Sequence, residues 1–384
     1  MDDSAAMITS SLCALMRGET VDPPAAQRAD FDAQARRALA YHGIGPLLSR
    51  ELARAGFAHP PRGFEFLFPD QTDKEGTAIE LVRRHELVRV LRTLAEAGVS
   101  ALLLKGAALA YSRYPSPALR PRADTDLLIR ETERAVADRV LTELGYSKPN
   151  AISGDLIKYQ CGYALRDRFR IEHLLDVHWR ISNTQLFSRT LAFDELWQRS
   201  MAIPMLGEHA RGLAAADALL HACMHRAHHM HSPFYVDDAS LVGGDRLIWL
   251  YDMHLLLEAM PLEERANFAR LAVERKMGAV CRDALMRAHQ CFGTRIEEGV
   301  LLALQNPGVV EPSEACLRRG AVRHLLTELR AMPRWGDRAA YLREHLFPPA
   351  EYMLAKYAVA NRAWLPMLYL QRGIQGAWKK VQGR

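Results

Sequence analysis

The chain has 384 residues, of which 49% are hydrophobic and 25% are charged, and its formal net charge at pH 7 is +5. This composition is typical of a globular protein and excludes disordered, collagenous and coiled-coil chains. The net charge is too small for a protein that coats nucleic acid. No apolar run reaches the roughly 18 residues of a membrane span, and the first residues are acidic where an export signal is basic. We therefore expect a cytoplasmic protein without a transmembrane segment.

Residues 1–97 form the first of three predicted regions, and their pattern indicates helices. Apolar residues recur at helical spacing over 30–43, a second helix begins at Pro46, and a third covers 77–97. Proline suits the first helical position because it has no N–H to leave unpaired. A stretch rich in proline and glycine between the second and third helices predicts a loop.

Residues 98–185 have a different pattern, which predicts a small mixed sheet. The short apolar runs VSALLLKG, ADTDLLIR and RIEHLLDVHWRI predict three strands, with a helix after the first strand and another between the last two. From 190 to 384 the pattern is helical again, apart from one predicted loop at 232–245. The expected fold class is α+β, with the small sheet domain flanked by N-terminal helices and a larger helical C-terminal domain.

Three acids lie on the predicted strands. Asp124 and Asp126 are two residues apart, so both carboxylates project from the same face of their strand. Asp176 lies within another apolar run, where an acid is unexpected. Two adjacent carboxylates repel unless a cation lies between them, and magnesium prefers carboxylate oxygen. We interpret the three acids as catalytic residues and metal ligands; the alternative is that each marks the exposed end of a strand.

The segment LLLKGAALAYSRYP, upstream of these acids, predicts a phosphate-binding turn. A buried strand runs into Lys105, Gly106 and Ala107 and then into a helix, whose first N–H groups can contact an anion. Lys105 is the only lysine between Lys74 and Lys148, and it follows three leucines. A lysine at the end of a buried strand suits a phosphate, although Lys-Gly-Ala alone is a weak signal.

Two further side chains are candidates near the predicted site. Arg120, on the loop that leads into the two aspartates, can pair with phosphate oxygens or simply solvate that loop. His178 shares the strand face of Asp176, so it either orients a metal ligand through a hydrogen bond or is an ordinary, partly buried histidine.

A stripe of polar residues marks the helical C-terminal region. Its members follow spacings of four, four and three, which places them on one helix face: Asp217, His221, His225 and His228. His229 follows directly and belongs to the same cluster. We expect a polar wall that faces the sheet domain, with His221 and His225 hydrogen-bonding behind the metal ligands or touching the base or acceptor. A packed histidine stripe and a zinc or iron site of a metal hydrolase are the alternatives.

The run LLLKGAALAYSRYPSPALRPRADTDLLI resembles the core motif of an uncharacterised bacterial nucleotidyltransferase family within the polymerase-β-like nucleotidyltransferase superfamily. Gly106 matches the glycine turn of that superfamily, Asp124 and Asp126 match its Asp-x-Asp, and Asp176 matches its third acid. The resemblance is specific over about residues 98–180 and weak in the flanking helices.

The resemblance implies transfer of a nucleoside monophosphate from a nucleoside triphosphate to a hydroxyl-bearing acceptor, with release of pyrophosphate. Mg²⁺, or alternatively Mn²⁺, would be the metal, and ATP is the default nucleotide. The residues expected to hold the nucleotide phosphates are Lys105, Gly106, Ala107 and Arg120.

Two departures from the superfamily pattern keep other functions open. Ala107 stands where serine is usual, and the interval between the glycine turn and the aspartates is longer than in most members. A non-catalytic nucleotide-binding or scaffold protein is therefore one alternative, and a tRNA-directed nucleotidyltransferase is another. A small molecule or peptide, as in secondary-metabolite biosynthesis, is the favoured acceptor.

Overall fold

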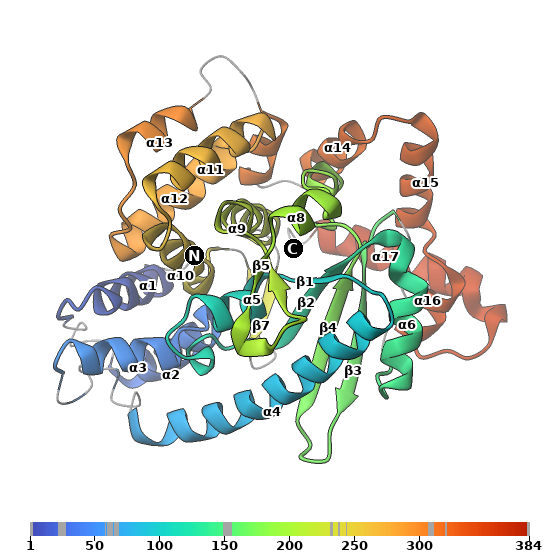
Figure 1. Cartoon of the computed structure of the whole chain (residues 1–384). Coiled ribbons are helices and arrows are strands. Elements are labelled where there is room, and N and C mark those ends of the chain that lie inside the picture. The colour runs from blue at the N-terminus through green and yellow to red at the C-terminus, as the bar shows by residue number, and fades with distance from the viewer. Residues whose placement is uncertain are drawn as a thin grey trace.

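The computed structural model describes residues 3–21, 28–57, 59, 64, 69–148, 156–230, 233–236, 239–242, 244–305, 311–318 and 321–381. The chain begins with helices, as predicted, and then enters a sheet (Figure 1). The N-terminal helices are α1 (Asp3–Met16), α2 (Arg28–His42), α3 (Gly45–Arg54) and α4 (Pro69–Glu96). The third predicted helix is longer than expected, because α4 begins within the stretch predicted as a loop.

A six-stranded mixed sheet, in the order β3-β4-β2-β1-β6-β5, lies at the centre of the molecule. Its strands are β1 (Ala101–Leu103), β2 (Asp124–Ile129), β3 (Gln160–Arg166), β4 (Glu172–His178), β5 (Met201–Ala202) and β6 (Arg211–Gly212). β2 runs parallel to β4 and antiparallel to β1, and β3 runs antiparallel to β4. The mixed sheet with helices before and after it confirms the predicted fold class.

The predicted alternation of strands and helices is confirmed in the sheet region. β1 is followed by α5 (Lys105–Ser112), and α6 (Arg134–Glu143) lies between β2 and β4 in the chain. In β2, Leu127 and Ile129 pack in one hydrophobic core with side chains of α4 and α6. Leu128 faces the opposite side of the sheet and packs in a second core with α9 (Ala215–His229). Because side chains alternate along a strand, Asp124 and Asp126 share the face of Leu128.

The sheet also contains strands that the sequence analysis missed. β3 was not predicted because its alternating residues Cys161, Tyr163 and Leu165 are separated by small or polar ones and form no apolar run. β5 and β6 are two residues each, too short to show a period, and they lie in a stretch predicted as helical. The predicted loop at 232–245 is also wrong in part, because β7 (Pro233–Val236) and β8 (Ala239–Val242) pair within it.

The remaining helices all follow β4 in the chain. They are α7 (Gln185–Ser188), α8 (Phe193–Arg199), α9, α10 (Leu247–Glu258), α11 (Leu262–Glu274), α12 (Gly278–Phe292), α13 (Glu298–Ala303), α14 (Ala321–Ala331), α15 (Trp335–Leu346), α16 (Ala350–Lys356) and α17 (Leu365–Val381). Buried side chains of α1, α2 and α3 share one hydrophobic core with α9, α10 and α12. The N-terminal helices thus stabilise the helical wall that faces the sheet.

Candidate active site

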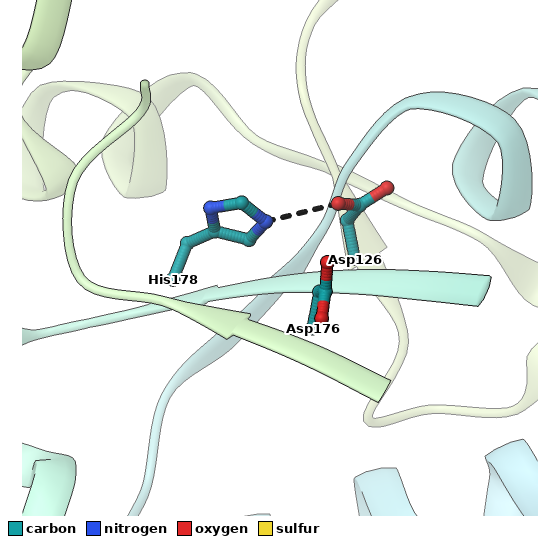
Figure 2. A group of neighbouring side chains, drawn as sticks. All are labelled: Asp126, Asp176 and His178. Atoms are coloured by element: carbon teal, nitrogen blue, oxygen red, sulfur yellow. Dashed lines mark hydrogen bonds and ion pairs between the residues drawn. The ribbon is translucent and has the colours of Figure 1, made fainter. Parts of the chain in front are cut away.

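Asp126 and Asp176 lie side by side, because they are register partners on the parallel strands β2 and β4. Their carboxylates lie close to the imidazole of His178, as Figure 2 shows. One ligand atom from each of these three residues falls within 4.8 Å of the others. Within the described part of the chain, no other group of three or more His, Cys, Asp or Glu side chains comes this close together. The sequence predicted all three residues for this site.

Two basic side chains hold the Asp126 carboxylate from the same side. Lys105 Nζ donates to Oδ1 of Asp126 at 2.8 Å, and His178 Nε2 donates to the same oxygen at 2.9 Å. Burial alone would raise the pKa of Asp126, but the Lys105 charge and the His178 hydrogen bond outweigh it and lower that pKa. Asp126 is therefore an ionised carboxylate at neutral pH. The interaction of His178 with Asp126 agrees with the orienting role expected for that histidine.

Asp176 is held by a chain of amides. Gln160 Nε2 donates to Oδ2 of Asp176 at 2.5 Å, and Asn183 donates in turn to Oε1 of Gln160 at 2.6 Å. Gly162 is the register partner of Asp176 on β3, and a Cβ at that position would lie 3.4 Å from Oδ1 of Asp176. The glycine thus leaves space beside the carboxylate, and the amide chain fixes its orientation.

Asp124 lies at the start of β2 and is more exposed than Asp126. Removal of water from its carboxylate raises its pKa, and the negative charges of Asp126 and Asp176 add to that shift. The Asp-x-Asp pair is therefore electrostatically unequal, since the pKa of Asp126 is lowered and that of Asp124 is raised. Asp124 lines the same cavity as the other two acids.

The predicted phosphate-binding turn forms the start of α5, beside these acids. Lys105 has a φ of 46°, a left-handed conformation that is unusual for a residue other than glycine. Gly106 lines the cavity with Lys105, and a Cβ on it would lie 3.4 Å from Nη1 of Arg120. The side chain of Ala107 is buried in the hydrophobic core, so only its backbone is available to a phosphate.

The side chain of Arg120 is buried, and it forms an ion pair that was not predicted from the sequence. Its guanidinium donates two hydrogen bonds to the carboxylate of Asp252 on α10, from Nε at 2.9 Å and from Nη2 at 2.8 Å. The hydroxyl of Tyr114 donates to Asp252 at 2.7 Å. The charge of Arg120 is thus already paired, and its plane packs beneath Gly106. This geometry favours a role in supporting the turn.

A cavity of about 690 Å³ joins these elements between the sheet and helices α9 and α10. Lys105, Gly106 and the three acids line one part of it, while His221, His225 and His229 line the wall formed by α9. Burial lowers the pKa of His221 to about 3, and the nearby positive charge of Lys105 acts in the same direction. Burial likewise lowers the pKa of His229 to about 3. These imidazoles are therefore neutral at pH 7.

The predicted histidine stripe divides between two directions. Asp217 accepts two hydrogen bonds from the guanidinium of Arg199, and His228 interacts through Nδ1 with the hydroxyl of Thr184. Neither residue lines the cavity, whereas His221 and His225 do. The four side chains do not gather around a common point, so the alternative of a zinc or iron site on this stripe is not supported.

Several residues of the site were not singled out from the sequence: Gln160, Asn183, Arg246, Trp249 and Asp252. Asp252 carried a usable signal, because an acid within the apolar helix LIWLYDMHLLLE needs a buried partner. Gln160 lies on the strand that was not recognised. The others are ordinary residues of helices or loops, and only their packing around the cavity distinguishes them.

The mixed sheet, the paired acids on its parallel strands and the helix start beside them agree with the resemblance to nucleotidyltransferases carried by the Lys-Gly-Ala and Asp-x-Asp segments. The sequence model of one protein family, described as uncharacterised nucleotidyltransferase, matches residues 30–293. The chain belongs to this family. No curated protein matches the sequence. In the described residues, no helix is both long and apolar enough to cross a membrane.

Proposed function

We propose that this nucleotidyltransferase transfers a nucleoside monophosphate from a nucleoside triphosphate to a hydroxyl group, releases pyrophosphate, and requires Mg²⁺ or Mn²⁺. The observation that carries this proposal is the placement of Asp126 beside Asp176 in a cavity that also contains the start of α5. A cavity of about 690 Å³ is within the usual range for a small-molecule ligand. ATP is the first nucleotide to test, and a small molecule or peptide is the favoured acceptor.

The donor atoms fit a hard divalent cation. Among the described residues, Oδ2 of Asp126 and Oδ1 of Asp176 accept no hydrogen bond, while the other oxygen of each carboxylate is occupied. Neither oxygen is among the buried polar atoms without a hydrogen-bond partner. Since neither accepts a hydrogen bond, both must be accessible. Oxygen ligands of this kind are those that Mg²⁺ prefers. Asp126 and Asp176 would hold the metal, with Asp124 at the edge of the site. A bound metal neutralises phosphate charge and lowers the pKa of a coordinated hydroxyl.

The chain's own residues would position the nucleotide. In the protein alone, Lys105 forms an ion pair with Asp126. When a bound metal ion balances the charge of Asp126, Nζ of Lys105 would turn toward the outgoing phosphates. The N–H groups of Gly106 and Ala107 lie in the first turn of α5, where they have no acceptor within the helix and can donate to phosphate oxygens. Arg120 would support this turn from below through its pair with Asp252.

Asp176 is the residue we assign to the acceptor. Its carboxylate is fixed by Gln160 and retains one accessible oxygen, so it can accept the proton of an attacking hydroxyl. In the protein alone, Lys105 and His178 keep Asp126 ionised and ready to bind a cation, which leaves Asp176 for the acceptor.

A pyrophosphate-release assay tests the proposal. The purified protein is incubated with each of the four NTPs, with Mg²⁺ or Mn²⁺, and with pools of small molecules, peptides or tRNA as acceptors. We expect metal-dependent release with one NTP, and a loss of about 100-fold or more in Asp176→Asn. Asp194→Asn is the matched control, because that carboxylate is 72% exposed and lies outside the cavity. NTP binding without release under any condition would instead support the non-catalytic alternative.

A further inference from the structure

The α9 wall of the cavity carries a group of rings that the proposed chemistry does not use. His225 and His229 on α9 and Trp249 on α10 line the cavity together. The ring centroids of His225 and Trp249 are 5.0 Å apart and nearly perpendicular, and those of His225 and His229 are 4.6 Å apart. His229 and Trp249 are separated by 6.1 Å. We call these three side chains the ring cluster.

The ring cluster lies along α9, on the wall of the cavity that also carries His221. The charge of Lys105 acts on His221, His225 and His229 alike, and the charge of Asp126 acts on His221 and His229, so this wall of the cavity faces the phosphate end. From His221 to His229 the helix advances eight residues, or about 12 Å at about 1.5 Å per residue. One cavity therefore contains both Lys105 and a group of rings spread along the α9 wall, so that a single nucleotide could contact both.

The chemistry of the ring cluster suits a flat, uncharged heterocycle. Burial lowers the pKa of His225 well below its ordinary value, and the neighbouring imidazoles and the positive charge of Lys105 also disfavour its protonation. The same causes keep His229 neutral. A neutral imidazole presents one N–H donor, one ring-nitrogen acceptor and a planar face. Trp249 adds a large aromatic ring, and the guanidinium of Arg246, which also lines the cavity, lies 5.5 Å from the centroid of that ring.

We propose that His225, His229 and Trp249 form the nucleobase subsite of the cavity, with the triphosphate of the same nucleotide at Lys105 and the start of α5. This inference rests on the proposed function, since it assumes that an NTP is the donor. Stacking on Trp249 would supply affinity, and the ring nitrogens of the two histidines would read the edge of the base. An aromatic acceptor in the same place is the competing occupant, and the test below separates the two.

The test compares a triphosphate ligand that carries a nucleoside with one that lacks it. The dissociation constants of a non-hydrolysable α,β-methylene NTP and of inorganic tripolyphosphate are measured with Mg²⁺ and no acceptor present. In Trp249→Leu and His229→Ala, we expect NTP analogue binding to weaken by about fivefold to 100-fold, because base stacking on an aromatic side chain contributes that much. Tripolyphosphate binding stays within twofold of the wild type, because the phosphate end is unchanged.

Matched variants guard against effects of altered folding. Trp249→Phe keeps an aromatic face and is expected to retain most of the analogue affinity. His254→Asn is the control histidine, because it lies on α10 and bonds to Thr294 outside the cavity. It should leave both ligands unaffected. Melting curves of all variants identify any that are unfolded, and if Trp249→Leu is among them, His229→Ala carries the comparison.

Each other outcome overturns the inference. Unchanged analogue binding in Trp249→Leu and His229→Ala would place the base elsewhere and leave the ring cluster to the acceptor. If the variants weaken the binding of both ligands equally, the ring cluster acts only through the shape of the cavity. A wild-type protein that binds tripolyphosphate as tightly as every NTP analogue would show no base subsite, while the proposed function stands. Failure to bind either ligand would reject the proposed function itself.

Discussion

Arg120 and Asp252 form a buried ion pair that joins the loop before β2 to helix α10, across 132 residues of sequence. Both side chains are less than a tenth exposed, and the Arg120 guanidinium packs beneath Gly106. The ion pair thus holds the phosphate-binding turn against the helical wall of the cavity. Tyr114 adds a hydrogen bond to the same carboxylate.

The first prediction concerns this ion pair. Asp252→Asn should destabilise the protein by about 3–5 kcal/mol, because it leaves the buried guanidinium of Arg120 without a counter-charge. The double variant Arg120→Met with Asp252→Leu should lose less stability than Asp252→Asn, since it removes both charges. Urea denaturation of the two variants and the wild type checks the prediction. A smaller loss of stability in Asp252→Asn than in the double variant would contradict this prediction. It would mean that the charge of Arg120 serves to bind a ligand and does not need Asp252 as its counter-charge.

The second prediction concerns the unequal pair Asp124 and Asp126. The pKa of Asp126 is lowered in the folded protein, so its ionised form contributes stability above pH 4 that is lost as the pH falls. The pKa of Asp124 is raised, so its ionised form costs stability at pH 7. In metal-free buffer at pH 7, Asp126→Asn should therefore lower the melting temperature, and Asp124→Asn should leave it unchanged or raise it.

Thermal melts in EDTA, with Asp194→Asn as the exposed control, measure these two shifts. Simple repulsion among three equivalent carboxylates would stabilise both variants, which is the opposite result for Asp126. Shifts of the same sign in the two variants would contradict the hydrogen-bonded arrangement of Lys105, Asp126 and His178.

The third prediction separates the charge of Lys105 from its backbone. Lys105→Gly and Lys105→Ala both remove the ammonium group, and both should weaken NTP binding by about tenfold or more. Only glycine accepts a φ of 46° without steric cost, so Lys105→Gly should be more stable than Lys105→Ala by about 1 kcal/mol. Isothermal titration and urea denaturation give the two quantities. Equal stabilities would show that the turn relaxes when the lysine is removed.

The fourth prediction is a pH dependence outside the catalytic site. Glu328 on α14 is buried, and burial raises its pKa to about 7, against the opposing hydrogen bond from the backbone N–H of Gln185. A raised pKa means that the folded protein binds the proton more tightly, so this contribution to stability is present below pH 4.5 and is lost as the pH rises through 7.

Glu328→Gln should therefore be more stable than the wild type at pH 8, by about 1–3 kcal/mol, and nearly equal to it at pH 4.5. Denaturation at both values tests this, with Glu208→Gln as the control because that side chain is 86% exposed. Destabilisation of Glu328→Gln at pH 8 would show that the ionised carboxylate is the form that the fold favours.

Much of the site follows from local sequence patterns. The apolar runs ending at Lys105 and Asp176, and the period of two in the segment with Asp124 and Asp126, predict the strands and place both acids on one face. These patterns depend on a few adjacent residues, and the alternation of side chains along a strand is a property of the backbone itself. The resemblance to the nucleotidyltransferase family rests on the same short segment, and the family match confirms it.

The tertiary structure alone decided which residues meet. Nothing local indicates that Asp126 and Asp176 become register partners, that Lys105 pairs with Asp126, or that Arg120 pairs with Asp252. The histidine stripe is a local pattern too, yet packing turned His221 and His225 into the cavity and His228 toward Thr184. These partners are tens of residues apart in the sequence, so only the packing of the sheet against the helices brings them together. A buried charge is costly without a counter-charge, and the local sequence around it does not show which residue supplies one.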